Sequence, residues 1–303
     1  MIAAVGAGSA GAVLREAALR LRASGSPTAL LDAQLLLGHV LGVERAVLLA
    51  EPERRPAAAE LAEFARLVER RAAGEPVAYL RGRKEFYGLS LTVDRRVLIP
   101  RPETELLVDL ALSRLASSAR RRRRLWDVGT GSGAIAVAVA VEARRRGLAD
   151  GLRILASDIS REALDVALAN AQAHGVADTI DFARADLLEL EPAEPADLLL
   201  ANLPYIPTDN LPGLAVAARF EPVAALDGGR DGLQQLRRLM AGLPAAVRSG
   251  AGALLEIGAD QAAPASSAAT QLLAGWQVAI HDDLAGNARV IELIDASRRP
   301  ARD

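Results

Sequence analysis

The sequence has 303 residues, with 36 lysines and arginines against 38 aspartates and glutamates, and it contains no cysteine. The net charge of -2 argues against a chain-wide nucleic-acid surface, and without cysteine there are no disulfides, cysteine zinc sites or thiolate nucleophiles. Apolar stretches such as Ala134–Val141 are far shorter than the roughly 20 residues that span a bilayer, and the N-terminus lacks the basic start of a secretory signal. We therefore expect a cytoplasmic protein of two domains with no membrane segment.

Residues 1–74 have the pattern of a small helical bundle. Ser26 and Pro27 are typical of a helix N-cap and first helical position, and Gly42 is typical of a helix end. An apolar stripe at helical spacing follows in Leu61, Phe64, Ala65, Val68 and Ala72. Because no catalytic group of residues occurs here, we expect a substrate-recognition domain.

Residues 75–102 alternate between apolar and polar side chains and end at Pro100 and Pro102, which predicts a β-hairpin linker. The remainder, residues 103–303, begins with a helix around Glu103–Leu115. Strand-like runs then alternate with helical patterns at Leu125–Val128, Leu152–Ser157, Thr179–Ala183, Asp197–Ala201 and Ala253–Ile257. This alternation predicts an α/β fold whose mostly parallel sheet has helices on both faces.

Three further segments are a terminal pair of strands, a run of arginines and the C-terminal tail. Gln277–His281 and Arg289–Ile294 are expected to pair as an antiparallel hairpin. The five arginines of Arg120–Arg124 fit a solvated helix end better than a nucleic-acid or ribosome contact. The tail from Ser297 is polar and expected to fray. The histidines are scattered and show no metal-ligand spacing, so no metal site is expected: His39, His174 and His281.

Two glycine-rich segments are candidates for a cofactor-binding loop. Gly6–Gly11 matches G-x-G-x-x-G, but no second strand with an acidic end follows it, so we interpret it as a flexible start. Asp127–Gly133, with sequence Asp-Val-Gly-Thr-Gly-Ser-Gly, follows a strand and opens a helix. Its glycines Gly129, Gly131 and Gly133 permit a sharp turn close to a ligand, with Thr130 and Ser132 between them.

Acidic residues at the ends of the next two strands extend this site. Asp158 is placed to accept the hydroxyls of a ribose, and Asp186 lies where an adenine amino group would be. The arrangement resembles the class I methyltransferase pattern, whose cofactor is S-adenosylmethionine. Asp127 supports that interpretation, because a carboxylate attracts a cationic sulfonium and amino group but repels a pyrophosphate.

The fourth strand delivers Asn202, Leu203, Pro204 and Tyr205 to the same end of the sheet. An amide nitrogen is a poor nucleophile, so an enzyme must orient it and polarise its N–H bonds. The Asn202 side-chain oxygen and the Pro204 carbonyl are suited to accept one N–H each, while the Tyr205 ring packs on the planar amide. Catalysis would then consist largely of positioning.

This segment resembles the N-P-P-Y motif of methyltransferases that modify nitrogens on planar groups, with Leu203 in place of the first proline. Since N-L-P-Y also occurs in ribosomal RNA adenine dimethyltransferases, the motif by itself leaves the substrate class open. Leu203 precedes a proline and is already biased to extended backbone, so the loss of a ring should cost only about 0.4–1 kcal/mol.

The wider sequence resembles the release factor glutamine methyltransferase family (PrmC/HemK) over about residues 28–294. The motifs that carry this resemblance are Asp32–Leu37, Gly74–Leu80, Glu85–Gly88, Val97–Glu105, Glu221–Gly229 and Asp231–Leu233. It implies an N-terminal helical domain, a hairpin and a seven-stranded, Rossmann-like class I methyltransferase domain.

The resemblance also implies that the substrate is the glutamine of the Gly-Gly-Gln motif in class 1 peptide chain release factors. Gly129–Gly133 and Asp158 would then hold S-adenosylmethionine, Leu187 would flank its adenine, and Asn202–Tyr205 would bind the glutamine. Arg101, Glu103 and Thr104 either wall the cleft or cap a helix. Direct nucleic-acid binding is not expected.

Three alternatives remain open on the residues alone. A nucleic-acid adenine methyltransferase is favoured by Leu203 and Arg120–Arg124, but the charge and the N-terminal helices weigh against it. A noncatalytic binding module would retain the cofactor fold as a scaffold. A dinucleotide oxidoreductase, which rests on Gly6–Gly11, ranks last.

Overall fold

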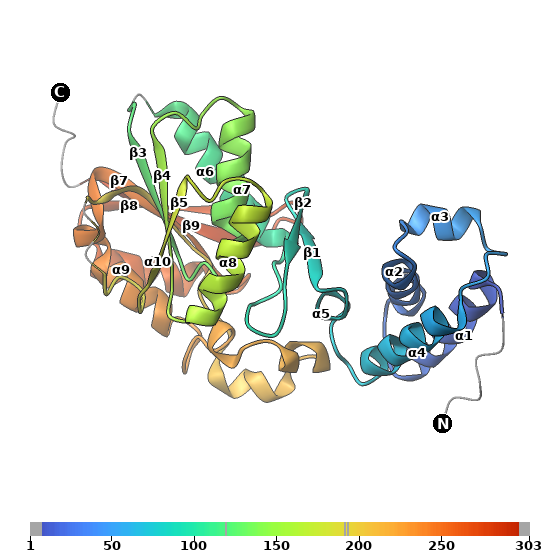
Figure 1. Cartoon of the computed structure of the whole chain (residues 1–303). Helices are drawn as coiled ribbons and strands as arrows, with labels where there is room; N and C mark the ends of the chain where they lie inside the picture. The colour runs from blue at the N-terminus through green and yellow to red at the C-terminus, as the bar shows by residue number, and fades with distance from the viewer. Residues whose placement is uncertain (1–7, 119, 191, 193, 297–303) are drawn as a thin grey trace. The chain divides into compact units, whose positions relative to one another are not determined.

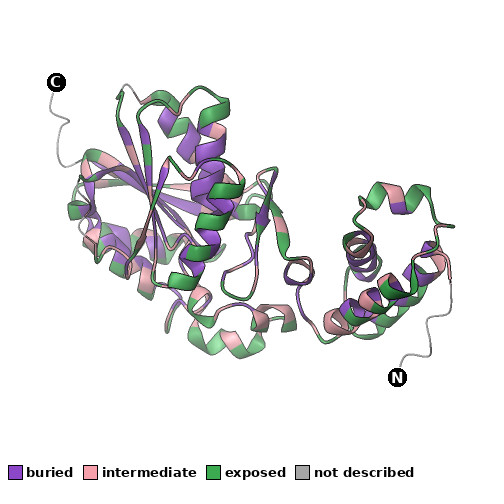
Figure 2. Cartoon of the chain, viewed as in Figure 1, coloured by how far each residue is buried: buried purple, intermediate pink, exposed green. Residues whose placement is uncertain are grey.

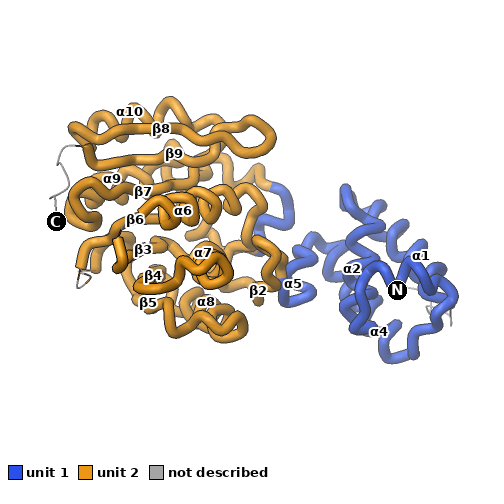
Figure 3. Tube along the Cα trace, turned by 90° about the horizontal axis from the view of Figure 1, so that it is seen from above, with its two compact units in different colours: residues 1–83, 215–220 blue, residues 84–214, 221–303 orange. Residues whose placement is uncertain are grey.

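The computed structural model describes residues 8–118, 120–190, 192 and 194–296 (Figure 1). The chain divides into two compact units, residues 1–83 with 215–220 and residues 84–214 with 221–303 (Figure 3). In the described part of the chain, no helix combines the length and the apolar character that crossing a membrane requires. The assignment of residues 1–74, 75–102 and 103–303 to recognition, linker and catalysis stays a prediction.

The first unit is the expected helical bundle. Its helices are α1 (Ala10–Ala23), α2 (Ala29–Leu41), α3 (Arg45–Ala50), α4 (Ala58–Ala72) and α5 (Val77–Arg81). The predicted stripe on α4 is confirmed, because Leu61, Phe64 and Val68 are buried in one cluster with α1 and α2. Gly6 and Ala7 of the first glycine-rich segment lie outside the described residues, and Gly11 is part of α1.

The predicted start of α2 is wrong by two residues. The helix begins at Ala29 with Thr28 as N-cap, and Ser26 does not cap it. Instead the Ser26 hydroxyl donates to the Asp32 carboxylate at 2.7 Å, and Thr28 donates to the same carboxylate at 2.8 Å. The end of α2 is confirmed, since Gly42 is left-handed with φ 64°.

The predicted hairpin is shorter than residues 75–102. Strands β1 (Arg83–Phe86) and β2 (Leu89–Thr92) form a two-stranded sheet. Its two-residue connection has positive φ at both Tyr87 and Gly88, the backbone typical of a tight hairpin turn. Residues expected to be extended form α5 instead, because Gly82 ends a short helix in the left-handed conformation while Tyr79 and Leu80 are buried.

The second unit contains a seven-stranded mixed sheet, which confirms the predicted α/β fold. Its strands are β3 (Arg123–Val128), β4 (Leu152–Asp158), β5 (Ile180–Arg184), β6 (Ala196–Ala201), β7 (Val247–Glu256), β8 (Trp276–Asp282) and β9 (Ala288–Asp295). The order in the sheet is β5-β4-β3-β6-β7-β9-β8. The first five are parallel, and β9 is antiparallel to both of its neighbours.

Helices cover both faces of this sheet (Figure 2). They are α6 (Glu105–Ser117), α7 (Ala134–Arg145), α8 (Arg161–Ala173), α9 (Gln234–Ala246) and α10 (Ala262–Leu272). Side chains of the central strands alternate between the two layers: Leu198 and Leu200 pack with α6 and α7, whereas Leu199 and Ala201 pack with α9 and α10. The 3-10 helices η1 (Pro102–Thr104), η2 (Thr208–Gly213) and η4 (Val223–Ala225) lie in its connections, and η3 (Val216–Phe220) belongs to the first unit.

The expectation of a solvated helix end at Arg120–Arg124 is confirmed in part: Arg120, Arg121 and Arg122 are exposed, but the segment is not the end of a helix. Helix α6 ends at Ser117, and Arg123 and Arg124 already belong to β3. Arg123 is buried, and its guanidinium donates to the carbonyls of Leu115, Leu148 and Asp150. Arg120 and Arg124 form ion pairs with Asp197 and Glu194. The run therefore has a structural role at the start of β3. The predicted fraying from Ser297 lies outside the described residues.

Candidate active site

A cavity of about 680 Å³ lies at the carboxyl ends of the parallel strands. This is where open α/β sheets bind ligands. Most of the predicted site residues line it: Gly129, Thr130, Gly131, Ser132, Asp158, Asp186, Leu187, Asn202, Leu203 and Pro204. The sheet order accounts for this convergence, because β4, β3 and β6 are neighbours and end on the same side.

The glycine-rich loop joins β3 to α7 in a conformation that requires glycine. Gly129, Gly131 and Gly133 all have positive φ, at 72°, 55° and 78°, a region that side chains strain. A Cβ at Gly133 would lie 3.0 Å from the Ala167 side chain, so the third glycine lets α7 approach α8. Backbone N–H groups of Gly129 and Thr130 donate to the Ser157 carbonyl at 2.8 and 2.9 Å, which ties the loop to β4.

Asp127 organises this loop from beneath. It is fully buried, and its Oδ2 accepts the Thr130 hydroxyl at 2.6 Å and the Ala136 N–H at 3.3 Å. Its Oδ1 has no hydrogen-bond partner among the described residues. Burial raises the pKa of Asp127 to about 6, and the hydrogen bond from Thr130 lowers it only in part. A buried oxygen without a donor is costly, and Asp127 itself does not line the cavity.

Asp158 ends β4 as predicted. Its Oδ2 accepts the Gly131 N–H and its Oδ1 accepts the Ser160 N–H, both at 2.9 Å. Burial raises its pKa, while these backbone donors lower it. The carboxylate is therefore held in place by the glycine loop and retains further acceptor capacity for hydroxyl donors.

The connection after β5 supplies the next wall of the cavity. Asp186 lies two residues beyond the strand and forms an ion pair with Arg238 of α9 at 2.9 Å. The following residue, Leu187, has φ 52° although it is not a glycine. Left-handed backbone at a branched residue costs about 1 kcal/mol or more and concentrates at ligand sites.

The segment after β6 forms the opposite wall. The Asn202 amide donates through Nδ2 to the Thr104 hydroxyl at 3.0 Å. Leu203 is buried, and its Cδ2 would lie 3.1 Å from a Cβ at Gly129, so its side chain packs under the glycine loop. Tyr205 is held by the Gln261 amide, which donates to its carbonyl at 2.9 Å, and burial raises the pKa of the Tyr205 hydroxyl.

A second glycine-rich segment braces this wall. The Ile206 N–H donates to the Leu226 carbonyl, and the Gly228 N–H donates to the Ile206 carbonyl. A Cβ at Gly228 would lie 2.8 Å from the Pro204 carbonyl oxygen, and one at Gly232 would also meet the segment. Gly228 therefore lets the Pro204 and Gly232 backbones pack closely, since its Cβ would also lie 2.6 Å from the Gly232 carbonyl oxygen.

Sequence reasoning missed several of these contacts. Arg238 and Gly228 were not among the predicted site residues, and neither was Glu256, which ends β7 beside Asn202. The one available signal for Glu256 was an acidic residue directly after the apolar run of its strand. Of the residues expected to wall the cleft or cap a helix, Thr104 lines the cavity, whereas Arg101 forms an ion pair with Glu221 and Glu103 is exposed.

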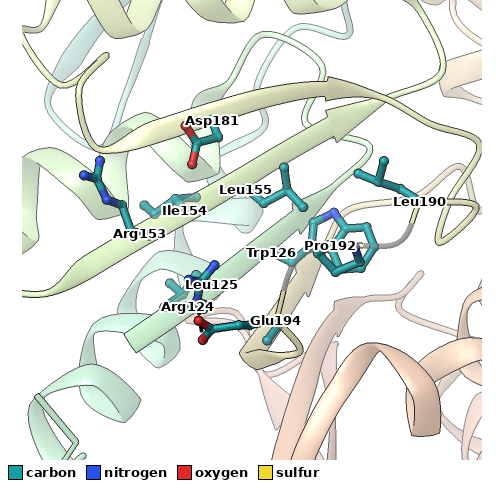
Figure 4. Close-up of a pocket in the computed structure, with 11 residues that line it drawn as sticks. Arg124, Leu125, Trp126, Arg153, Ile154, Leu155, Asp181, Leu190, Pro192 and Glu194 are labelled. Carbon is teal, nitrogen blue, oxygen red and sulfur yellow. Dashed lines mark ion pairs between the residues drawn. The ribbon is translucent and has the colours of Figure 1, made fainter. Parts of the chain in front are cut away.

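A smaller cavity of about 230 Å³ lies on β3 and β4 away from these residues (Figure 4). It is lined by the apolar side chains of Trp126 and Leu155 and by the ion pair of Arg124 with Glu194. The indole N–H of Trp126 is satisfied by the Ser157 hydroxyl at 2.8 Å. None of the predicted catalytic or cofactor residues lines this cavity.

Comparisons with known proteins identify the family of this chain. The model of the PrmC N-terminal domain matches residues 12–82, and the model of the RMKL-like methyltransferase domain matches residues 107–207. A release factor glutamine methyltransferase from Moorella thermoacetica is 40% identical over 276 residues, covering 91% of this chain and 95% of that protein. One from Xylella fastidiosa is 44% identical over 232 residues, covering 77% of this chain and 81% of its own length.

A solved structure supports the fold alone. The hMettl16 catalytic domain in complex with MAT2A 3′UTR hairpin 1 is 14% identical, with a TM-score of 0.55 over 82% of this chain and 85% of that one. The identity to the two bacterial relatives extends through both units of the chain, including the helical one. The chain belongs to the release factor glutamine methyltransferase family.

Proposed function

We propose that this protein transfers a methyl group from S-adenosylmethionine to the side-chain amide nitrogen of a glutamine, that of the Gly-Gly-Gln motif in class 1 peptide chain release factors. The products are N5-methylglutamine and S-adenosylhomocysteine. Release factors act in the cytoplasm, which is the compartment expected for a chain of this composition.

The residues proposed to bind the cofactor lie at the cavity. Gly129–Gly133 give close backbone approach, Asp158 offers acceptors for ribose hydroxyls, and Asp186 and Leu187 flank the adenine. Asp127 lies buried under the loop, and its carboxylate favours a nearby cationic sulfonium and amino group over a phosphate. The bound cofactor supplies an electrophilic methyl group on a sulfonium.

The residues that bind the substrate glutamine act by orienting its side-chain amide. Because Asn202 directs its Nδ2 to Thr104, its Oδ1 is the atom left for the substrate, and it accepts one amide N–H. The carbonyl of Pro204, which lines the cavity, accepts the other N–H. Tyr205 packs against the planar amide. Holding both N–H groups fixes the nitrogen lone pair in line for attack, which supplies the rate enhancement by positioning.

One observation carries the proposal: Asn202, Leu203 and Pro204 line the same cavity as the glycine loop and Asp158, in a chain 40% identical to a release factor glutamine methyltransferase over 91% of its length. Leu203 in place of a proline is accommodated because it packs under Gly129. The alternative, an adenine methyltransferase acting on nucleic acid, loses support from Arg120–Arg124, since Arg123 is buried and two others are paired.

The test is transfer of labelled methyl from S-adenosylmethionine to purified release factor, to its Gln→Ala variant and to ribosomal RNA in parallel. Label on the wild-type factor alone would support glutamine methylation. Label on the RNA with an unlabelled factor would refute it in favour of the nucleic-acid alternative.

A further inference from the structure

Glu256 is a buried carboxylate that the chemistry above does not use. It ends β7, is 2% exposed, and neither of its carboxylate oxygens has a hydrogen-bond partner of normal geometry in the described part of the chain. A buried, unpartnered carboxylate costs stability. Such a cost is commonly retained at functional sites.

The sheet register places Glu256 beside Asn202. In the parallel pair β6–β7, Ala201 aligns with Leu255, so the next residues of the two chains, Asn202 and Glu256, continue the same alignment. Aligned positions on adjacent strands direct their side chains to the same face. Glu256 does not line the cavity, which puts it behind Asn202 rather than beside the substrate.

Thr104 connects the two side chains. It occupies the N-cap position of α6, yet its hydroxyl makes no capping hydrogen bond to the helix. A threonine there ordinarily accepts a backbone N–H, whereas the 3%-exposed Thr104 accepts the Nδ2 of Asn202. A hydroxyl that accepts this bond still has one proton to donate, and the Thr104 hydroxyl lowers the pKa of the Glu256 carboxyl.

We propose that Glu256 is a positioning residue for methyl transfer: it accepts the Thr104 hydroxyl proton, so that Thr104 must accept from Asn202 Nδ2 and the Asn202 oxygen faces the substrate. This inference rests on the proposed function. Without the acceptor, the Thr104 hydroxyl is free to donate to Asn202, which turns the amide over. An NH2 group would then face the NH2 group of the glutamine, and donors cannot pair with donors. Hydrogen bonds of this kind are often long without substrate and shorten in the complex.

The test compares variants that remove or keep each hydrogen-bonding group. Thr104→Val removes the hydroxyl and Thr104→Ser keeps it, while Glu256→Leu removes the acceptor and Glu256→Gln keeps one. Thr179→Val is the matched control, because it removes a hydroxyl bonded to Asp178 at the start of β5, away from the cavity. Turnover on release factor, the KM for release factor and the Kd for S-adenosylmethionine are measured for each.

We expect Thr104→Val and Glu256→Leu each to lower kcat at least about 10-fold, with KM and cofactor Kd within about 3-fold of wild type. Thr104→Ser, Glu256→Gln and Thr179→Val should stay within about 3-fold in kcat. The double variant Thr104→Val/Glu256→Leu should be no more than about 3-fold worse than the poorer single variant, because both changes break one chain of hydrogen bonds.

Additive losses in the double variant, or full turnover in Thr104→Val, would overturn the role of Glu256. If Glu256→Leu does not fold, the contrast between Thr104→Val and Thr104→Ser decides. A wild-type enzyme that leaves the release factor unlabelled would refute the proposed function, and this inference with it. An active wild type with active Thr104→Val would refute the inference alone.

Discussion

Glu256 should make the folded protein sensitive to pH in a way that its removal abolishes. Burial raises its pKa from the ordinary 4.5 to about 7; Thr104, Arg289 and Arg101 lower it, and Glu103 raises it. Glu256 in turn raises the pKa of Tyr205. Since one pKa unit corresponds to about 1.4 kcal/mol, ionising Glu256 costs roughly 3 kcal/mol more in the folded protein than in the unfolded chain.

The direction of the effect follows from linkage. A pKa that is higher in the folded state means that the folded protein binds the proton more tightly, so the stabilisation is fully present below about pH 4.5 and is lost as the pH rises through 7. Glu256→Gln cannot ionise. The variant should therefore gain roughly 2–3 kcal/mol in unfolding free energy relative to wild type between pH 5 and pH 8.

Urea unfolding at pH 5, 6, 7 and 8 measures this difference. Both tryptophans, Trp126 and Trp276, belong to the sheet of the second unit, so their fluorescence reports its unfolding. Glu221→Gln is the matched control, because Glu221 is equally buried but is paired with Arg101, and its removal should destabilise the protein at pH 8. A Glu256→Gln difference that does not change with pH would refute the reasoning.

Three other predictions concern the site and the fold. Asn202→Ala should lower kcat roughly 100-fold with little change in cofactor Kd, whereas Asp158→Ala should raise the cofactor Kd; calorimetry and single-turnover assays separate the two, and the reverse pattern would contradict both assignments. Gly228→Ala puts a methyl group 2.6 Å from the Gly232 oxygen and 2.8 Å from the Pro204 oxygen, so this wall of the cavity should shift, with turnover falling sharply and the Tm dropping by a few degrees; an unaffected turnover would show that the position of the Pro204 oxygen is not critical. Arg123→Met leaves three carbonyls without their donor and should lower the unfolding free energy by about 2–4 kcal/mol, measured by urea denaturation; an unchanged midpoint would refute its structural role.

Local patterns explain why so much of the sheet was predictable. Apolar runs such as Leu198–Leu200 and turns such as Asp127–Gly133 are short-range features, so the strands and the glycine-rich turn were found within a few residues. Strand β7 was predicted too short, because the sequence Ser249–Gly252 has the composition of a turn; in the structure it belongs to β7, with Gly250 at φ 77° and a shift in the pairing with β6.

The contacts that were not predicted join residues that are far apart in the sequence. Thr104 and Asn202 are 98 residues apart, and only the strand order brings Glu256 beside them. Nothing in their local sequences indicates the pairing. Helix α5 was missed for a different reason, since Val77 and Tyr79 favour strands and only burial and Gly82 determine the helix.

The position of β9 has a consequence for folding during synthesis. This strand lies between β7 and β8 and pairs with both, although it follows them in sequence. Until residues 288–295 have left the ribosome, β8 has no neighbour to pair with and β7 exposes an open edge. Unpaired edges of this kind favour aggregation. The nascent chain can therefore assemble β3 to β7 early, but the strand that supplies Glu256 gains its second neighbour only when β9 arrives.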